Sequence, residues 1–252
     1  MKKRLDILLF ERKLVDSREK AQRLIMAGLV QVDGKKEIKS GTKFEEDATI
    51  TITERPQYVG RGAEKMKGAA EAFKIDFKDK IIADIGSSTG GFTDFALQNG
   101  AKKSYAIDVG HGQLDWRLRN DPRVVVMEQT DFRKINSFPE IIDIVVIDVS
   151  FISVRKILEH LKNIRYSILD IEERKVKQCP DVIILFKPQF EAGKEIVDKC
   201  KGVIKDPEIH KELLNNFISW CSENGFKIIG QIDSPIKGDD GNREFLFNLK
   251  IC

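Results

Sequence analysis

Five short apolar runs, separated by stretches with helical spacing, constrain the fold of this chain more than any other feature. Strands that are buried on both faces of a sheet have nearly continuous apolar sequences of this length. The runs are Ile81–Ile85, Tyr105–Asp108, Val124–Met127, Ile144–Val149 and Val182–Phe186. Helices are predicted between or after them: Phe92–Asn99, Ile152–Ile164 and Glu208–Glu223. Strands that alternate with helices predict an α/β fold, with a Rossmann-like, doubly wound sheet and helices on both of its faces.

Further elements flank these runs. The large domain is expected to begin with one more helix and to end with a hairpin, in the segments Ala63–Phe73, Lys227–Ile232 and Glu244–Lys250. Glu54–Gly62 contains one proline and two glycines, a composition typical of a linker. The chain has 252 residues, which is enough for one large domain and one small one. We therefore expect two domains, residues 1–60 and residues 61–252.

The start of the chain has the pattern of a small α+β domain. Leucines at helical spacing cover Arg4–Lys13, and Ser17 suits the N-cap of a second helix, Arg18–Ala27. Alternating apolar and polar residues at Val30–Val32 and Thr49–Thr53 predict two short strands. Two helices followed by small strands form a compact unit that is separate from the large sheet.

Basic residues are concentrated in the small domain. Residues 1–43 contain 12 Lys and Arg against 6 Asp and Glu, whereas residues 63–252 contain 29 against 30. A local excess of this kind is typical of a surface that contacts phosphates, although a solvated basic helix face gives the same signal. Charge alone therefore indicates a nucleic-acid partner without establishing one.

Two stretches of the small domain resemble a known RNA-binding module. Asp-Ser-Arg-Glu-Lys-Ala at 16–21 and Gly-Leu-Val-Gln-Val-Asp-Gly at 28–34 are similar to the module named after the fourth protein of the small ribosomal subunit. The resemblance covers about residues 2–60 and implies that the domain binds RNA. The residues expected to contact RNA are Arg4, Arg18, Lys20 and Arg23. The alternative is a helical scaffold that only packs on the rest of the chain.

A glycine-rich turn follows the first apolar run. The segment Ile-Ala-Asp-Ile-Gly-Ser-Ser-Thr-Gly-Gly-Phe at 82–92 reads as a strand, a turn and the start of a helix. Its glycines do not follow the Gly-x-Gly-x-x-Gly order of dinucleotide sites. Asp84 favours a cationic group over a pyrophosphate, and a sulfonium-bearing amino acid has an ammonium for Asp84 and a carboxylate for backbone amides. We expect Asp84, Gly86, Ser88 and Gly90 to bind such a cofactor.

Two further carboxylates follow the next two strands. Asp108 ends the second run, 22 positions after Gly86, where an acid commonly accepts the hydroxyls of an adenosine ribose. Asp131 follows the third run and could accept from the adenine amino group. Three elements at successive strand ends therefore predict an adenosine-containing cofactor.

Four more segments carry polar residues that packing explains poorly. They are Gly60–Lys65, Ile147–Phe151, Leu185–Glu191 and Gly241–Phe245. Asp148 and Lys187 lie at the carboxyl ends of predicted strands, where doubly wound proteins bind ligands. An ionisable residue directly after a buried apolar run predicts a functional role.

These segments, with the glycine-rich turn, are similar to those of the TlyA-type (haemolysin A) enzymes within the FtsJ-like ribose methyltransferases. The similarity runs over essentially the whole chain. It implies methyl transfer from S-adenosylmethionine to a ribose 2′-hydroxyl of ribosomal RNA, with the RNA or a ribosomal subunit as partner. It also implies a Lys-Asp-Lys-Glu tetrad, which falls on Lys65, Asp148, Lys187 and Glu244. The closing strand pair fits this class better than a dehydrogenase.

The tetrad suits the chemistry that the resemblance implies. A ribose hydroxyl must lose its proton as it attacks a methyl group, and a lysine can take that proton only if its pKa falls from about 10.4. Burial and a second cation both lower a lysine pKa. We therefore assign Lys187 as the general base, Lys65 as the neighbouring cation, and Asp148 and Glu244 as orienting acids.

Three other functions remain open at this point. The chain could be a base-directed RNA amino-methyltransferase, because Asp148-Val149-Ser150-Phe151 loosely resembles the Asp-Pro-Pro-Tyr/Phe loop of those enzymes, although it lacks both prolines. The haemolysin name suggests a membrane-active protein, which would need a strongly amphipathic or apolar segment. The third is a ribosome-binding protein whose methyltransferase fold has lost its chemistry.

Composition limits the cellular setting. The 4 cysteines and 3 histidines are scattered without a Cys-x-x-Cys pair, so we expect no metal site and no disulfide framework. No run of about 18 apolar residues occurs that could span a membrane. Charged residues interrupt the start of the chain too early for a signal peptide. We expect a cytoplasmic protein with reduced cysteines.

Overall fold

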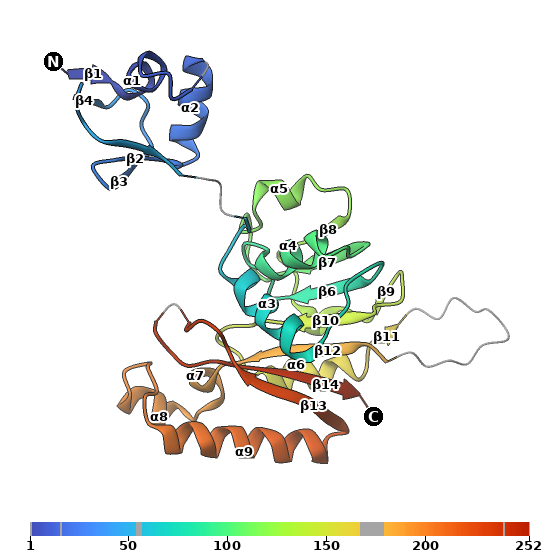
Figure 1. The fold of residues 1–252 in the computed structure, drawn as a ribbon. Helices are drawn as coiled ribbons and strands as arrows, with labels where there is room; N and C mark the ends of the chain where they lie inside the picture. The colour runs from blue at the N-terminus through green and yellow to red at the C-terminus, as the bar shows by residue number, and fades with distance from the viewer. Residues whose placement is uncertain (1, 16, 54–56, 167–178, 239, 252) are drawn as a thin grey trace. The chain divides into compact units, whose positions relative to one another are not determined.

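A computed structural model describes residues 2–15, 17–53, 57–166, 179–238 and 240–251 of the chain. Its contacts divide the chain into two compact units, Met1–Gln57 and Tyr58–Cys252, each with its own core. Figure 1 traces the elements of both units along the chain.

The first unit is built from two short helices and two small antiparallel sheets. Its elements are β1 (Lys2–Arg4), α1 (Leu5–Glu11), α2 (Arg18–Met26), β2 (Val30–Val32), β3 (Lys35–Glu37), β4 (Lys43–Glu45) and β5 (Ile50–Ile52). One sheet has the order β3-β2-β5, and β1 pairs with β4 in the other. The core between helices and strands is apolar, with Leu5, Leu9, Ile25 and Val30 fully buried. The small α+β domain is confirmed.

The ends of the first helices follow from specific contacts. Ser17 is the predicted N-cap of α2, and its hydroxyl accepts from the Lys20 backbone N–H at 3.1 Å. The first helix begins one residue later than predicted, because Arg4 pairs with Lys43 in the β1–β4 ladder. Strands β1, β3 and β4 were not predicted, since their sequences are mostly charged and have no apolar alternation.

The predicted linker, Glu54–Gly62, is described only in part. Residues 54–56 lie outside the described residues, and the second unit already begins at Tyr58. The backbone N–H of Val59 donates to Asp94 Oδ2 at 2.8 Å, which attaches this segment to the large unit.

The second unit contains a seven-stranded sheet in the order β13-β14-β12-β10-β6-β7-β8. Its strands are β6 (Ile81–Ile85), β7 (Lys103–Ile107), β8 (Val124–Met127), β10 (Ile144–Ile147), β12 (Asp181–Phe186), β13 (Phe226–Asp233) and β14 (Phe245–Ile251). The five strands predicted from apolar runs are parallel, and β14 and β13 form the predicted antiparallel pair at one edge. A second, two-stranded sheet pairs β9 (Ser137–Phe138) with β11 (Arg165–Tyr166).

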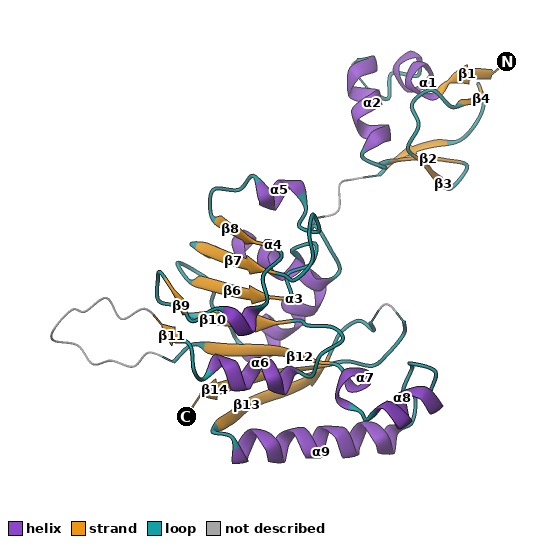
Figure 2. Ribbon diagram, turned by 180° about the vertical axis from the view of Figure 1, so that it is seen from behind, coloured by secondary structure: helices purple, strands orange, loops and turns teal. Residues whose placement is uncertain are grey.

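Helices cover both faces of the large sheet (Figures 1 and 2). They are α3 (Gly62–Phe73), α4 (Gly91–Gln98), α5 (Trp116–Arg119), the 3-10 helix η1 (Phe132–Lys134), α6 (Val154–Leu161), α7 (Pro188–Glu191), α8 (Lys194–Lys199) and α9 (Pro207–Glu223). Successive strand residues alternate between two cores: Ile183 packs with α3 and α4, whereas Ile184 packs with α6 and α9. The doubly wound α/β fold is confirmed.

Two strands end earlier than the apolar runs suggested, and the difference positions two candidate residues. The second run was expected to continue to Asp108 and the fourth to Val149, but the strands stop at Ile107 and Ile147. Asp108 and Asp148 therefore lie in the loops just beyond the carboxyl ends of β7 and β10, where their side chains are not committed to either core.

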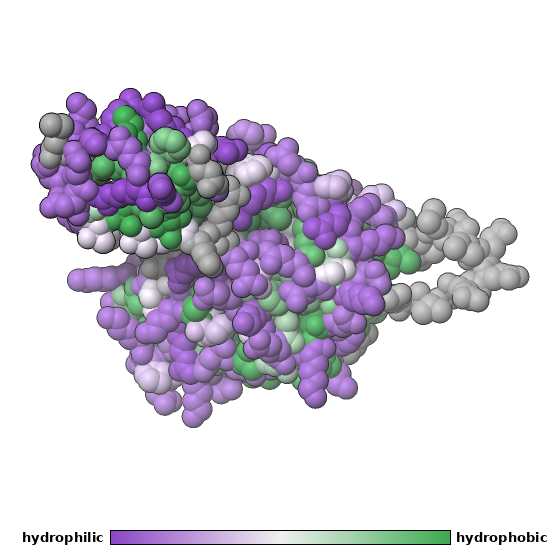
Figure 3. All heavy atoms as spheres, turned by 45° about the horizontal axis from the view of Figure 1, so that its top comes forward, coloured by the Kyte–Doolittle hydropathy of each residue, from purple (hydrophilic) through white to green (hydrophobic). Residues whose placement is uncertain are grey.

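In the described part of the chain, no helix combines the length and the apolar character needed to cross a bilayer. On the face in Figure 3, hydrophilic side chains predominate and hydrophobic ones are scattered among them. Phe151 is the most exposed of the large hydrophobic residues, at 92%. It lies in the loop after β10, two residues beyond Val149.

Candidate active site

The glycine-rich turn lies directly after β6. Gly86 has a φ of +82°, and a Cβ atom at this position would collide with the carbonyl oxygen of Asp148. Only glycine fits here, because the turn must both adopt a left-handed conformation and approach the neighbouring backbone closely. The turn at β6 is therefore packed against the end of β10, next to a member of the predicted tetrad.

Hydrogen bonds join this turn to the end of β7. The backbone N–H groups of Gly86 and Ser87 donate to the Ile107 carbonyl at 2.8 and 3.1 Å. Ser88, with a φ of +47°, donates its backbone N–H to Asp108 Oδ2 at 2.8 Å. The structure thus brings Gly86, Ser88 and Asp108 together. Asp108 Oδ1 accepts from the Gly110 N–H at 2.7 Å, which holds its carboxylate in place.

Gly90 is the residue from which α4 begins. Its φ is +92°, and a Cβ atom would collide with the side chains of Leu118 and Leu114. Glycine is therefore required for the chain to turn into the helix. The first backbone N–H groups of this eight-residue helix have no partner within the helix itself, a feature that anion-binding helix ends use.

Asp84 is buried within β6, with 1% of its surface exposed. Its Oδ2 accepts from the Thr93 hydroxyl at 2.7 Å and from the Thr93 backbone N–H at 3.1 Å, which ties β6 to the first turn of α4. Burial raises the pKa of this carboxyl to about 7, against the lowering effect of the Thr93 bonds. Asp84 therefore combines a structural contact, which was not predicted, with a carboxyl that is costly to ionise without a cation.

Asp131 lies beyond β8, as expected, but its carboxylate already has partners within its own loop. Its carboxylate caps η1 and binds the guanidinium of Arg133 at 2.7 and 3.0 Å, which lowers its pKa. Thr130, the residue before it, donates its N–H to the Asp108 carbonyl at 2.9 Å. The structure thus keeps this loop beside the end of β7, with an arginine partner that was not predicted.

The four predicted catalytic residues form two ion pairs. Lys65 Nζ of α3 lies 2.6 Å from Glu244 Oε2, and the two side chains are 10% and 3% exposed. Lys187 Nζ lies 2.6 Å from Asp148 Oδ1, with 11% and 20% exposed. Burial raises the pKa of Glu244, whereas Lys65 and then Lys187 lower it and Asp148 raises it. The charges of Lys65, Lys187 and Asp148 all act on the Glu244 carboxyl, so the two ion pairs belong to one cluster.

Strand order explains why these residues meet. Lys187 follows β12, Asp148 follows β10 and Glu244 precedes β14, an antiparallel neighbour of β12. Adjacent strands lie about 4.8 Å apart, so these three positions line up along one edge of the sheet. The Gly86 turn comes next in line, after β6. Lys65 joins the row from α3, which covers this part of the sheet.

Three residues in the loops around Lys187 were not assigned a role from the sequence. Ser150 Oγ accepts from Lys187 Nζ at 2.9 Å. The ring centroids of Phe151 and Phe190 lie 5.2 Å apart. The backbone φ of Phe151 is +64°, which is rare for a bulky residue. The Glu191 side chain is 3% exposed. Its carboxylate accepts hydrogen bonds from the Ser153 hydroxyl and the Val154 backbone N–H, at the far end of the loop that carries Ser150. All three stand within the quoted motifs, yet their partners are distant in sequence.

Glu128 shapes the loop after β7 and was also missed. Its carboxylate accepts from the backbone N–H groups of Gly112, Gln113 and Leu114 and from Arg119. These bonds lower its pKa to about 2. The loop that follows Asp108 is therefore held in a defined course. A carboxylate at the end of a buried strand was the available signal, as it was for Asp108.

A buried acid organises the predicted RNA-binding arginines in the first unit. Asp6 is 0% exposed, and its carboxylate binds Arg4 through two bonds at 2.9 and 3.0 Å. It also accepts from Arg18 at 3.1 Å and from Gln22 at 2.9 Å. These partners hold the pKa of Asp6 well below its usual range despite burial. The structure therefore brings Arg4 and Arg18 together on one carboxylate.

Lys20 and Arg23 lie on the same helix as Arg18, and both are exposed. Because α2 turns its apolar residues Ala21 and Ile25 inward, its basic residues face away from the core.

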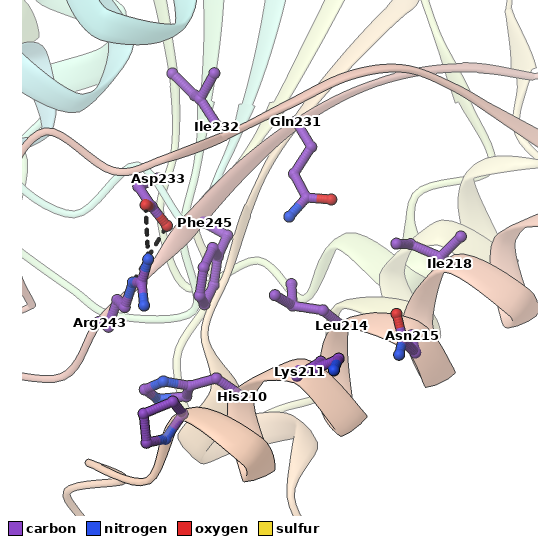
Figure 4. Close-up of a pocket in the computed structure, with 11 residues that line it drawn as sticks. His210, Lys211, Leu214, Asn215, Ile218, Gln231, Ile232, Asp233, Arg243 and Phe245 are labelled. Carbon is purple, nitrogen blue, oxygen red and sulfur yellow. Dashed lines mark hydrogen bonds and ion pairs between the residues drawn. The ribbon is translucent and has the colours of Figure 1, made fainter.

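A separate hollow of about 450 Å³ lies between α9 and the β13–β14 pair. Figure 4 shows His210 and Leu214 projecting from α9 towards Phe245, with Arg243 bound to Asp233 at one end. None of the predicted cofactor or catalytic residues lines it. In the described part of the chain, no group of three or more His, Cys, Asp or Glu side chains could hold a metal ion.

Both units of the chain are similar to known proteins. Residues 58–251 match the sequence pattern of the FtsJ-like methyltransferase family, and residues 3–50 match that of the S4 domain family. A candidate rRNA methyltransferase of Bacillus subtilis, YqxC, is 48% identical over 98% of this chain and 85% of its own. The 16S/23S rRNA (cytidine-2′-O)-methyltransferase TlyA of Mycobacterium tuberculosis is 38% identical over 98% of this chain and 89% of its own.

Among solved structures, one described as a candidate hemolysin from Streptococcus thermophilus has a TM-score of 0.71 and 39% identity. That similarity covers 99% of this chain and 88% of the other. The family model spans more than half of the chain, and the similar proteins extend through both units. This chain therefore belongs to the FtsJ-like methyltransferase family and carries an S4 domain ahead of its methyltransferase domain.

Proposed function

We propose that the turn after β6 binds S-adenosylmethionine. Gly86, Ser88 and Gly90 would shape the turn around the cofactor, because their own N–H groups already donate to Ile107, Asp108 and Ser87. The first backbone N–H groups of α4 would hold the carboxylate of the amino acid. The Asp108 carboxylate already accepts two N–H bonds and has lone pairs left for the ribose hydroxyls. When bound, S-adenosylmethionine supplies an electrophilic methyl group on a sulfonium and leaves as a neutral thioether.

Asp84 and Asp131 complete the proposed cofactor site. The Asp84 carboxyl has a raised pKa and accepts from two neutral donors, the hydroxyl and the backbone N–H of Thr93, which suits it to a cation such as the amino-acid ammonium. Asp131 would accept from the adenine amino group while it keeps Arg133. The fit of the donor set supports this cofactor: backbone N–H groups for an anion lie beside carboxylates for a cation and for hydroxyls.

We propose further that the enzyme methylates a ribose 2′-hydroxyl of ribosomal RNA. The observation that carries this proposal is the row of Glu244, Lys187 and Asp148 along the sheet edge, with Lys65 paired to Glu244. A relative named as an rRNA (cytidine-2′-O)-methyltransferase supports the same substrate class. Such a substrate is consistent with the expected cytoplasmic location.

Lys187 is the general base in this proposal. The ribose oxygen forms a bond to the methyl carbon as the carbon–sulfur bond breaks, and the electrons of that bond remain on sulfur. The hydroxyl proton passes to Nζ of Lys187, which must be neutral when it receives it. Asp148 holds this nitrogen at 2.6 Å beside the turn that binds the cofactor.

The other pair acts without taking the proton. Lys65 is held by Glu244 at 2.6 Å, and its positive charge would stabilise the negative charge that develops on the ribose oxygen. Removing either partner would leave a charge unpaired in a nearly buried position.

The base-directed alternative uses the same cofactor but a different acceptor. An exocyclic amine attacks without a strong base, so Lys187 and its ion pair would have no task. The proposal of ribose methylation therefore explains more of the charged cluster. For the membrane-active alternative, none of the described helices is long and apolar enough to cross a membrane.

Replacement of Lys187 tests the base. Lys187→Ala should lower the methylation rate by about 10²–10⁴-fold, the usual cost of losing a general base. Binding of S-adenosylmethionine, measured by calorimetry, should remain nearly unchanged because Lys187 acts on the hydroxyl. Lys250→Ala is the matched control, since Lys250 forms a Lys–Asp pair with Asp181 at 2.6 Å on neighbouring strands. Near-native turnover of Lys187→Ala would contradict the assignment.

Asp84 makes cofactor binding depend on pH. Its pKa is about 7 in the free protein, and a bound ammonium would lower it. Below pH 7 the carboxyl must lose a proton on binding, so affinity should rise with pH and level off above about 7. Asp84→Asn should bind more weakly and lose this dependence. Calorimetric titration between pH 5.5 and 7.5 measures the affinity of each protein for S-adenosylmethionine and its dependence on pH. An affinity of the native protein that does not change with pH would refute the ammonium contact.

We also propose that the S4 domain binds RNA phosphates through Arg4 and Arg18. Each guanidinium has five N–H donors and uses only some of them in hydrogen bonds to Asp6. The others could donate to a phosphate. Both side chains are partly exposed, at 42% and 47%. Asp6 is buried, so it acts as the fixed support on which the two arginines are oriented.

This arrangement predicts an unusual effect of removing a negative charge. Asp6→Asn makes the domain more basic, yet it should weaken RNA binding because the arginines lose their orientation. Arg18→Gln should weaken binding and reduce the slope of log K against log salt by about 0.7–0.9, the value of one phosphate contact. Filter binding to ribosomal RNA across a salt series measures both effects.

Arg123→Gln is the control for the salt series, because Arg123 is held by Asp121 in a similar pair on the other unit. Thermal unfolding separates a folding defect from a loss of contact. Tighter binding by Asp6→Asn, with an unchanged melting temperature, would show that net charge rather than orientation governs the interaction.

A further inference from the structure

The contacts of Lys187 include one that the tetrad does not account for. A lysine nitrogen has three positions besides its bond to Cε. Ser150 Oγ accepts a hydrogen bond at one of them, at 2.9 Å, and Asp148 Oδ1 lies 2.6 Å from the nitrogen as its ion-pair partner. In the neutral amine, an N–H bond directed at Ser150 Oγ limits rotation about the Cε–Nζ bond and so limits the side on which the lone pair lies. The acceptor hydroxyl must approach from that side.

Ser150 is exposed, so packing does not explain its position. The next residue, Phe151, has a φ of +64°, a conformation that costs a non-glycine residue about 1–2 kcal/mol. Such a backbone persists only where surrounding contacts hold it. The turn that directs Ser150 towards Lys187 is therefore maintained against a local cost.

Glu191 fixes the far end of this loop. Its two carboxylate oxygens accept from the Ser153 hydroxyl and the Val154 backbone N–H, both at 2.7 Å. Glu191 belongs to α7, which begins directly after Lys187. The segment that carries the base and the loop that carries Ser150 are thus tied together by a nearly buried carboxylate, 3% exposed.

We infer that Ser150 is a positioning residue for Lys187: its hydroxyl holds the amine so that the lone pair faces the incoming ribose hydroxyl. Ser150 does not bind the cofactor or exchange the proton in this role. The inference rests on the proposed function of Lys187 as base.

The test compares four full-length variants on ribosomal subunits prepared from cells that lack this methylation, with radiolabelled S-adenosylmethionine. Ser150→Ala should lower the maximal rate about tenfold, the effect of one lost hydrogen bond of moderate strength. The KM for the subunits and the affinity for the cofactor should stay close to native values. Ser150→Thr keeps a hydroxyl and should restore most of the rate.

The pH profile separates orientation from general damage to the loop. A hydrogen bond accepted from Nζ favours the charged amine, so its loss should shift the half-maximal rate of Ser150→Ala to lower pH. Ser153→Ala weakens the same loop at its Glu191 end, without touching Lys187, and should lower the melting temperature but leave the half-maximal pH unchanged.

The outcomes distinguish this inference from the proposal beneath it. If Lys187→Ala keeps its activity, the base assignment fails and the role of Ser150 fails with it. If Lys187→Ala is inactive but Ser150→Ala has a native rate and pH profile, only the positioning role is refuted. A lower rate in Ser150→Ala with an unshifted profile, equal to that of Ser153→Ala, would also refute it, because that pattern reports loop stability alone.

Discussion

The ends of four adjacent strands, β14, β12, β10 and β6, hold the site together. Their spacing of about 4.8 Å is set by backbone hydrogen bonds and not by any side chain of the site. Glu244, Lys187, Asp148 and Gly86 each stand at the end of one of these strands, so their order in space repeats the order of the sheet. The close approach of Gly86 to the Asp148 carbonyl joins the cofactor turn to the charged cluster. A change in strand order would separate the two.

The charged cluster is stable because each lysine has one carboxylate. A single lysine or glutamate at these depths would cost several kcal/mol unless it became neutral. Pairing Lys65 with Glu244 and Lys187 with Asp148 gives four formal charges that sum to zero when all are ionised. The arrangement has a chemical consequence, because a proton arriving on Lys187 remains beside a carboxylate that stabilises it. The first unit uses a related principle, with one buried acid, Asp6, that orients two arginines.

The sequence predicted most of the large sheet, because strands buried on both faces have continuous apolar sequences. Their alternation with helices was sufficient for the doubly wound fold. Five strands were missed. In the small domain β1, β3 and β4 are three residues long and mostly charged, and their pairing depends on the rest of that domain. In the large unit β9 and β11 have only two residues each. Asp148 could be identified from its position near the end of the fourth apolar run, and Lys187 from its position directly after the fifth. Lys65 within α3 and Glu244 in a turn were recognised only through the family resemblance, since neither follows an apolar run.

The contacts of the site were less predictable than its residues. Ser150, Glu191 and Asp6 owe their roles to partners that are between 2 and 38 positions away, and no local pattern indicates which of those positions meet. The same limit applies to Asp131, whose pairing with Arg133 reduces the acceptor capacity expected of it. Local sequence predicts where a polar residue stands relative to a strand, and folding decides what it touches.

The most direct test of ribose methylation is an acceptor that lacks the oxygen itself. Ribosomal RNA with a 2′-deoxyribose at the target nucleotide should bind almost normally, since it loses only one hydroxyl contact. Methyl transfer to that nucleotide, followed by mass spectrometry of the nucleosides, should be undetectable, whereas the ribose substrate should gain its methyl group on the sugar. Transfer to the deoxy substrate at an unchanged rate, with the methyl group on the base, would contradict the role assigned to Lys187.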